Sequence, residues 1–310
     1  MPAPNALACP ASLKSVLSAR EAAAALEDGF ADAGVECVPL PLADGGEGTV
    51  DALCDLVGWV EAADAFGRPR NARVGRRDGA TFVEAAEVIP FDPDHLDVMQ
   101  ASSRGFGELI MRLSPERLVV ALGGTANMDA GLGLLEVVDR LPAPTTVLCD
   151  VRTTLYDAPQ LFGPQKGATP EQVAELEERF RSLASLAPYA DLPGAGAAGG
   201  LGAAFASLGA ELVAGASAVL DFVGFDPTPF DLVVTGEGRV DATTVEGKAP
   251  IEVARRCAAA EVPCVVFGGI VAAPVPGTET VALSGDPELA ADDLLELGLR
   301  LGTRLLDSAR

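Results

Sequence analysis

Residues 230–260 read FDLVVTGEGRVDATTVEGKAPIEVARRCAAA. A short aliphatic run enters a loop that contains Gly236, Gly238 and Gly247, and an Ala-rich amphipathic segment follows. This order of strand, glycine loop and helix is typical of a parallel sheet with crossover helices. It recurs at VECVPLPL (35–42), ADGGEGT (43–49) and VDALCDLV (50–57), and at RLVVAL (117–122), GGTANMDAGLG (123–133) and LLEVVDRL (134–141). The sequence therefore predicts an α/β fold.

Helix boundaries are signalled by capping residues. Ser18 and Glu21 form a capping box before AREAAAALEDGFADA (19–33), and Thr169, Pro170 and Gln172 mark a second helix start. VPCVVFGGIV (262–271) is predicted to be a strand, and PELAADDLLELGLRLGTRLL (287–306) an amphipathic helix. The stretch PGAGAAGGLGAAFASLGA (193–210) is interpreted as a loop that enters a packed helix.

Composition limits the classes of partner. The chain has 310 residues, of which 49% are hydrophobic, which suits two domains. A net charge of -23 disfavours nucleic acid and anionic membrane surfaces, so an anionic substrate would need local cations. The six cysteines occur singly and are expected to be reduced core thiols, and the single histidine, His95, nearly excludes a His-based triad or a His-ligated metal site. The N-terminus resembles no leader and no run is long enough to cross a bilayer, so we expect a cytoplasmic protein.

Three glycine-rich loops, at residues 43–49, 123–133 and 193–202, sit before predicted helices, and the first two of them also follow predicted strands. In open α/β sheets this is where ligands bind, because glycine lets the backbone approach a ligand and helix N-termini present unpaired N–H donors. Such loops can also be simple tight turns. None of them matches the Walker pattern or a convincing dinucleotide-binding fingerprint, which disfavours a P-loop ATPase and a Rossmann dehydrogenase.

The loop of residues 235–250 has the richest mixture of charges: Glu237, Arg239, Asp241 and Lys248. Phosphoryl transfer needs a cation for the phosphate oxygens, carboxylates that hold Mg²⁺ and a group that orients the attacking hydroxyl, and this loop contains all three residue types. The alternative is a solvated loop in which Glu237 and Arg239 form a surface pair.

Five segments resemble the motifs of the type I glycerate kinase family, in the family's order. They are ADGGEGT (43–49), GGTANMDAGLG (123–133), FGPQKGA (162–168), PGAGAAGGLGAA (193–204) and TGEGRVDATTVEGKAP (235–250). The resemblance implies two α/β domains, one a flavodoxin-like parallel sheet formed by both chain ends (1–62 and 228–310) and the other inserted in the middle (63–227), with the active site in the cleft between them. It also implies ATP-dependent phosphorylation of D-glycerate to 2- or 3-phosphoglycerate, with Mg²⁺.

The motifs assign candidate residues to roles. Lys14, Arg239, Asp241 and Lys248 are expected to be catalytic, with the two lysines facing phosphate or carboxylate and Asp241 orienting the glycerate hydroxyl. Asp44, Glu47 and Glu237 are expected to hold the metal. The nucleotide is expected to contact Gly45, Gly46, Gly123, Gly124, Asp129, Gly196, Gly199, Gly200, Gly236 and Gly238.

The chain departs from the family pattern at several of these segments. Ala11 stands where the family has aspartate, Asn127-Met128 replaces Thr-Asn, Thr153 replaces asparagine and Thr243 replaces glutamine. A paralogue with weakened or lost catalysis that binds a ligand, and a purely structural domain, are therefore alternatives to an active kinase. The preferred acid, the hydroxyl that is phosphorylated and the choice between a monomer and a homodimer stay open.

Overall fold

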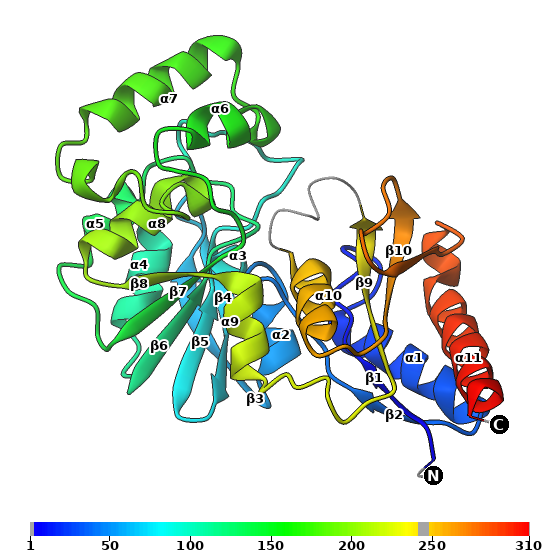
Figure 1. Ribbon diagram of the computed structural model, residues 1–310. Helices are drawn as coiled ribbons and strands as arrows, with labels where there is room; N and C mark the ends of the chain where they lie inside the picture. The colour runs from blue at the N-terminus through cyan, green and yellow to red at the C-terminus, as the bar shows by residue number, and fades with distance from the viewer. Residues whose placement is uncertain (1–2, 241–247, 310) are drawn as a thin grey trace. The chain divides into compact units, whose positions relative to one another are not determined.

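The computed structural model describes residues 3–240 and 248–309. Strands and helices are interspersed along the chain, and the strands form two sheets (Figure 1), which confirms the predicted α/β class. The chain divides into two compact units. Unit 1 comprises Met1–Asp44, Asp51–Leu53 and Val219–Arg310, and unit 2 comprises Gly45–Val50 and Cys54–Ala218. The predicted boundary after residue 62 falls inside β3 (Leu56–Ala63), a strand of the sheet in unit 2.

Unit 1 is built on a parallel sheet of five strands in the order β11-β10-β9-β1-β2. Read in chain order from the β2 edge, the strands run 2-1-3-4-5, which is the flavodoxin-like arrangement. Both chain ends contribute, as predicted from the family resemblance. The strands are β1 (Asn5–Ala8), β2 (Glu36–Pro39), β9 (Leu232–Val240), β10 (Cys264–Val271) and β11 (Glu279–Ala282).

Two helices of unit 1 pack closely because glycine leaves room at their contact. In α1 (Ala19–Asp32) Gly29 lies against the backbone of Leu295, and in α11 (Ala290–Ser308) Gly298 lies against the backbone of Leu26. The predicted capping box at the start of α1 is present, with the Glu21 N–H donating to the Ser18 Oγ at 3.2 Å. Further helical elements that include residues of this unit are α2 (Thr49–Leu53), α9 (Gly215–Phe222), α10 (Ala249–Ala259) and the 3₁₀ turn η4 (Pro287–Leu289).

Unit 2 is built on a mixed sheet of six strands in the order β3-β4-β5-β6-β7-β8. β3, β4 and β5 pair antiparallel, whereas β5 to β8 are parallel. Asp78 and Gly79, with φ of 48° and 73°, make the tight turn between β4 and β5, because a two-residue hairpin of this type needs positive φ at both positions. The remaining strands are β4 (Pro69–Arg77), β5 (Ala80–Glu84), β6 (Arg117–Ala121), β7 (Thr145–Cys149) and β8 (Glu211–Ala214).

The helices of unit 2 include α7 (Pro170–Ser182), which begins with the predicted capping box of Thr169 and Gln172. The residues after Pro193 do enter a packed helix, α8 (Ala197–Ser207), but Ala198, Gly199 and Gly200 have positive φ and interrupt its first turn. The other helical elements are α3 (Ala85–Val88), α4 (Arg104–Met111), α5 (Leu132–Leu135), α6 (Ala158–Phe162), η1 (Pro164–Lys166) and η2 (Ala187–Tyr189).

Two predicted helices are wrong in extent. The helix expected over 50–57 ends at Leu53, and Leu56–Ala63 forms β3 instead, because the run LVGWVEAA pairs along its whole length with β4. The helix expected over 134–141 is only the short α5, since Val137 and Val138, which are β-branched, and Asp139 disfavour its continuation. Among the described residues, no helix combines the length and apolar character that crossing a membrane requires.

The contact of α1 with α11 gives a stability prediction. A Cβ at position 29 would lie 2.0 Å from the carbonyl oxygen of Leu295, so Gly29→Ala must push the two helices apart. Overpacking of this kind costs about 1–3 kcal/mol, and the melting temperature measured by calorimetry should fall by several degrees. The control is Asp28→Ala, a change at the exposed neighbouring position. Equal melting temperatures for both variants would contradict the tight contact.

Candidate active site

The three glycine-rich loops are brought together in unit 2, at the carboxyl end of its parallel strands. A Cβ at Gly123 would lie 2.7 Å from Cα of Gly46, and one at Gly199 would lie 2.1 Å from the carbonyl oxygen of Asn127. Ala130, in the second loop, donates its N–H to the carbonyl of Gly199 at 2.9 Å. Side chains larger than hydrogen would separate these loops. The glycines therefore serve loop-to-loop contact as well as any contact with a ligand.

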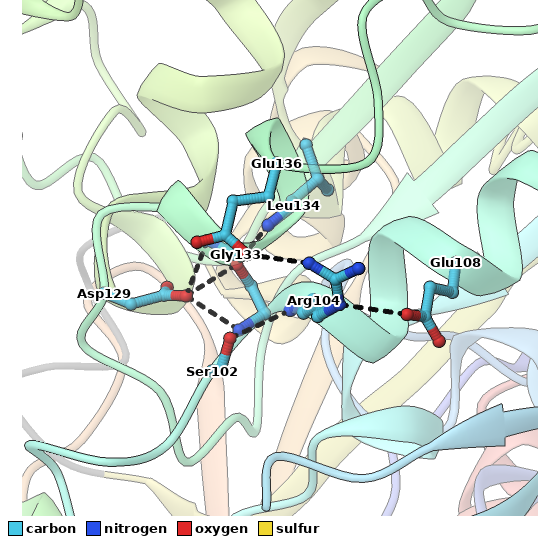
Figure 2. A network of polar contacts seen from close by, with 8 residues as sticks. Ser102, Arg104, Glu108, Asp129, Gly133, Leu134 and Glu136 are labelled. Carbon is cyan, nitrogen blue, oxygen red and sulfur yellow. Dashed lines mark hydrogen bonds and ion pairs between the residues drawn. The ribbon is translucent and has the colours of Figure 1, made fainter. Parts of the chain in front are cut away.

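Asp129 organises the loop that follows β6. Its buried carboxylate accepts five hydrogen bonds: from Ser103 N (2.7 Å), Ser103 Oγ (2.8 Å), Gly133 N (3.2 Å), Asn127 Nδ2 (2.9 Å) and Gly131 N (3.0 Å). Figure 2 shows Asp129 facing Gly133, while Arg104 is turned to Glu108 and Glu136. Five donors occupy the acceptor positions of a carboxylate. The geometry makes Asp129 the residue that shapes the loop, and its contact with nucleotide stays a prediction.

Lys166 is a buried cation that sequence reasoning missed. It ends η1 in the FGPQKGA segment, is only 6% exposed, and donates from Nζ to the carbonyl of Asn127 at 2.8 Å and to Thr125 Oγ1 at 3.4 Å. Burial lowers the pKa of Lys166 to about 8, and the charges of Asp150 and Asp129 partly oppose this shift. The motif itself was the available signal, because it contains a lysine in an otherwise uncharged segment.

Glu84, at the end of β5, holds the ADGGEGT loop and was also missed. It is 1% exposed, and its two oxygens accept from Gly48 N (3.0 Å) and Val50 N (2.5 Å) at the start of α2. Burial raises the pKa of Glu84 to about 7, against the lowering effect of these two hydrogen bonds. A carboxylate directly after the buried run ATFV was the signal in the sequence.

In unit 1 a separate charged cluster lies at the carboxyl ends of β1 and β9. Lys248 Nζ is 3.4 Å from Glu237 Oε2, and the Glu237 side chain is 13% exposed. The segment after β1 follows β9, because Ala11 N donates to the Gly236 carbonyl at 2.9 Å. This segment brings Lys14, which is exposed, close to Gly238. Arg239 is exposed at the end of β9. Asp241 and Thr243 lie outside the described residues.

The predicted glycine positions differ in what surrounds them. Gly196 and Gly236 are enclosed by backbone, since a Cβ would come within 2.3 Å of the carbonyl oxygen of Thr154 or of Phe267. Gly238 is less confined, with 3.4 Å to Cα of Leu13. Gly124 lies beside Glu47, where a Cβ would be 3.7 Å from Oε2. Contact of these positions with nucleotide stays a prediction.

The predicted metal ligands do not form a cage of their own. Within residues 3–240 and 248–309, no three His, Cys, Asp or Glu side chains are grouped as a metal site would require. Asp44 is half-buried, Glu47 exposed and Glu237 mostly buried. Mg²⁺ prefers oxygen ligands and is usually held by one or two carboxylates together with substrate phosphates. The side chains therefore fit Mg²⁺ that arrives with a phosphate ligand, and the assignment itself stays a prediction.

The departures from the family pattern fall in different environments. Met128 is fully buried in an apolar cluster with Leu155, Leu176 and Phe180, so the thioether packs as a core side chain. Its neighbour Asn127 donates from Nδ2 to Asp129 and to the carbonyl of Ala198. Thr153 accepts the N–H of Gly196 with its carbonyl, a backbone role that tolerates the change of side chain.

The fold and these clusters define an α/β protein with two units, each of which has glycine backbone and charged side chains at the carboxyl ends of its parallel strands. The profile of the glycerate kinase family matches residues 6–140 and 138–284. A glycerate kinase of Bacillus subtilis (strain 168) is 35% identical over an alignment of length 318, which covers 84% of this chain and 83% of that protein. A glycerate 2-kinase of Escherichia coli (strain K12) is 34% identical over an alignment of length 307, which covers 79% of this chain and 80% of that one.

A crystal structure from Salmonella typhimurium LT2 assigned as glycerate kinase 2 is similar over 99% of both chains, with a TM-score of 0.83 at 29% identity. The chain belongs to the glycerate kinase family and is an enzyme of the kinase class. The family predicted from the five motifs is thereby confirmed.

Asp129→Asn tests whether this carboxylate shapes the loop. The amide would turn an NH₂ group toward N–H donors that now point at an acceptor, and each buried donor left unpaired costs about 1–3 kcal/mol. The melting temperature should fall by several degrees, whereas Asp139→Asn at an exposed position should leave it unchanged. An unchanged melting temperature with lost nucleotide affinity would instead make Asp129 a direct ligand contact.

Glu84 predicts a pH dependence of stability. Because its pKa of about 7 in the folded protein lies above the usual 4.5, the folded state binds more protons than the unfolded state between these values, and stability falls as pH rises across this window. Glu84→Gln cannot titrate, so its melting temperature should fall less than that of the wild type between pH 5 and pH 7.5. Glu116→Gln, at an exposed position, is the control. Parallel pH curves for the wild type and Glu84→Gln would rule out the linkage.

Proposed function

We propose that this enzyme transfers the γ-phosphoryl group of ATP, bound with Mg²⁺, to a hydroxyl group of D-glycerate and releases 2- or 3-phosphoglycerate. The proposal takes its substrate from the names of the relatives, which are a glycerate kinase and a glycerate 2-kinase. The observation that carries it is the pairing of Lys248 with Glu237 at the carboxyl end of β9. An ammonium group beside a carboxylate supplies two of the groups that phosphoryl transfer requires.

The glycine-rich loops of unit 2 support the same reaction. They place backbone from three segments together at the carboxyl end of the parallel strands of the sheet, where α/β proteins bind ligands. Two buried charged groups fix these loops, Asp129 in the second loop and Glu84 beneath the first. Loops held in this way are pre-organised, so binding does not have to order them again.

The roles of the side chains follow from their charges. Lys248 and Lys14 would neutralise phosphate or carboxylate oxygens, and Arg239 would add a fixed positive charge at the same strand ends. Asp44, Glu47 and Glu237 offer the oxygen ligands that would hold Mg²⁺, and a bound Mg²⁺ would supply charge neutralisation at the phosphates. Asp241 would accept the proton of the attacking hydroxyl, a role that sequence alone assigns to it. The cytoplasmic location stays a prediction from sequence, and the choice between a monomer and a homodimer stays open.

A ligand-binding paralogue without turnover is the second candidate. Its motivation is Ala11, since the family has an aspartate there and the backbone of Ala11 is fixed beside Gly236 at the same strand end as Glu237. A missing carboxylate at this position could remove a ligand of the metal or of the substrate. It would leave the backbone contacts of the loop in place.

Turnover and the position of phosphorylation can be measured together. With Mg·ATP and D-glycerate we expect ADP release and a new phosphate ester in the ³¹P spectrum. Without proton decoupling, a 2-phosphate should give a doublet from its single methine proton, and a 3-phosphate should give a triplet from its methylene protons. Stabilisation by Mg·ATP without any ester would favour the ligand-binding paralogue. If neither ATP nor D-glycerate raises the melting temperature, both proposals fail.

The role of Lys248 is tested in the same assay. Lys248→Met removes the charge and keeps most of the side-chain volume, so the fold should be intact while kcat falls by about two to three orders of magnitude, as for the loss of a group that stabilises transition-state charge. Arg255→Gln, at an exposed position of α10, is the matched control and should keep full activity. Activity of Lys248→Met equal to that of the control would remove Lys248 from the reaction.

A further inference from the structure

Lysine is rare in this chain and occurs only in the motif segments and the segment after β1. Of 22 basic residues three are lysine, namely Lys14, Lys166 and Lys248. Lys14 is exposed and Lys248 is half-buried beside Glu237, whereas Lys166 is buried in unit 2. A buried ammonium group is costly unless it forms strong interactions, so its retention in the interior calls for a specific task.

The carbonyl to which Lys166 donates lies at the junction of two glycine-rich loops. Lys166 Nζ is 2.8 Å from the Asn127 carbonyl oxygen, and this same oxygen is the atom that a Cβ at Gly199 would strike at 2.1 Å. One ammonium group therefore fixes the point where the loop after β6 touches the loop that enters α8. Thr125 Oγ1, at 3.4 Å from Nζ, extends the contact toward the start of the loop.

The loop itself is not in a relaxed conformation. Ala130 has a φ of 56°, which is costly for a residue other than glycine. Asn127 Oδ1 is buried and has no hydrogen-bond partner among the described residues. The amide cannot simply be flipped, because its Nδ2 donates to a carboxylate and a carbonyl. A strained loop conformation persists only where contacts with its surroundings fix it. Here Asp129 accepts hydrogen bonds from the second half of the loop, and Lys166 donates to Thr125 and Asn127 in the first half.

We infer that Lys166 is a positioning residue: its ammonium group holds the Asn127 carbonyl and so keeps the Gly123–Gly133 loop in the arrangement that binds substrate. That Lys166 positions the loop rests on geometry, and that the loop binds substrate rests on the proposed function. The charged groups that bear on Lys166 are Asp150, directly after β7, and Asp129, within the loop. Both carboxylates favour the charged form of Lys166, and burial favours the neutral form.

The charge of Lys166 makes two properties change in opposite directions with pH. Its pKa of about 8 lies below the usual 10.5, so above pH 8 the folded protein loses this charge and the charge-assisted bond to Asn127, and activity should fall. Over the same range the unfolded chain binds more protons than the folded one, so the contribution of Lys166 to stability rises with pH. A residue that merely supported the fold would not separate activity from stability in this way.

Three variants of the full chain test the inference. The kcat/KM of the wild type for D-glycerate should fall by about tenfold per pH unit above pH 8, which is the slope expected when one group loses one proton. Lys166→Arg, which keeps its charge, should retain activity without this decline up to pH 9.5. Lys166→Met should have at least about tenfold lower kcat/KM at pH 7.5, a melting temperature equal to or above that of the wild type, and faster hydrogen exchange in residues 123–133. Arg140→Gln, an exposed change in the same unit with the same loss of charge, should match the wild type.

Three results would overturn the inference. The first is a Lys166→Met variant equal to the wild type in kcat/KM and in exchange, and the second is lost activity with unchanged exchange, which would mean that Lys166 contacts the substrate itself. A lower melting temperature with undiminished activity per folded molecule would make its role structural only.

A separate measurement distinguishes failure of this inference from failure of the proposed function. With ¹³C-labelled lysine the chain gives signals from three lysines, and the one absent from Lys166→Met should titrate near pH 8 in the wild type. If the wild type shows no turnover, this titration and faster exchange of residues 123–133 in Lys166→Met still support the positioning role. Unchanged exchange of residues 123–133 in Lys166→Met overturns it whatever the activity.

Discussion

The buried carboxylate of Asp129 is the interaction on which the loop architecture of unit 2 depends. Five donors from two segments, Ser103 and the loop itself, converge on its two oxygens, and they include the N–H groups of Gly131 and Gly133 as well as both donors of Ser103. A loop in which Ala130 adopts a φ of 56° cannot hold its shape by local preference alone. The carboxylate supplies the missing constraint from within the loop. The contacts with Lys166 and with the loop at Gly199 then have a fixed surface to meet.

The parts of the fold that the sequence predicts are those with local causes. Ser18 with Glu21, and Thr169 with Gln172, cap helices through hydrogen bonds that span three residues, so their effect can be seen in the sequence. The run LVGWVEAA is different, because it becomes β3 through pairing with β4, and the sequence before it had suggested that the preceding helix continues. Tertiary pairing overrides local preference there. The antiparallel β3-β4-β5 edge of the sheet in unit 2 could not be anticipated for the same reason.

The site residues show the same difference between features with local causes and features that depend on distant partners. Five motifs identified the family and the loops, since glycine and charge patterns are features of contiguous sequence. Glu84 and Lys166 were missed because their roles come from partners far along the chain: Gly48 is 36 residues from Glu84, and Asn127 is 39 residues from Lys166. A glutamate or lysine has no special role until the fold buries it, and burial is also what shifts the pKa of each group toward neutrality.

The arrangement of the second loop also bears on whether the departures from the family pattern mark decay. Met128 removes a polar side chain from the motif, yet it fills an apolar cluster completely, and the adjacent Asn127 bonds to both Asp129 and Ala198. The strained Ala130 and the buried Lys166 are retained around it. Both features cost stability, and a chain released from ligand binding could remove either with a single substitution, by glycine at position 130 or by an apolar side chain at position 166. Their joint presence favours a loop that still binds a ligand, and among the departures at described positions it leaves Ala11 in unit 1, not the loop of unit 2, as the one that bears on catalysis.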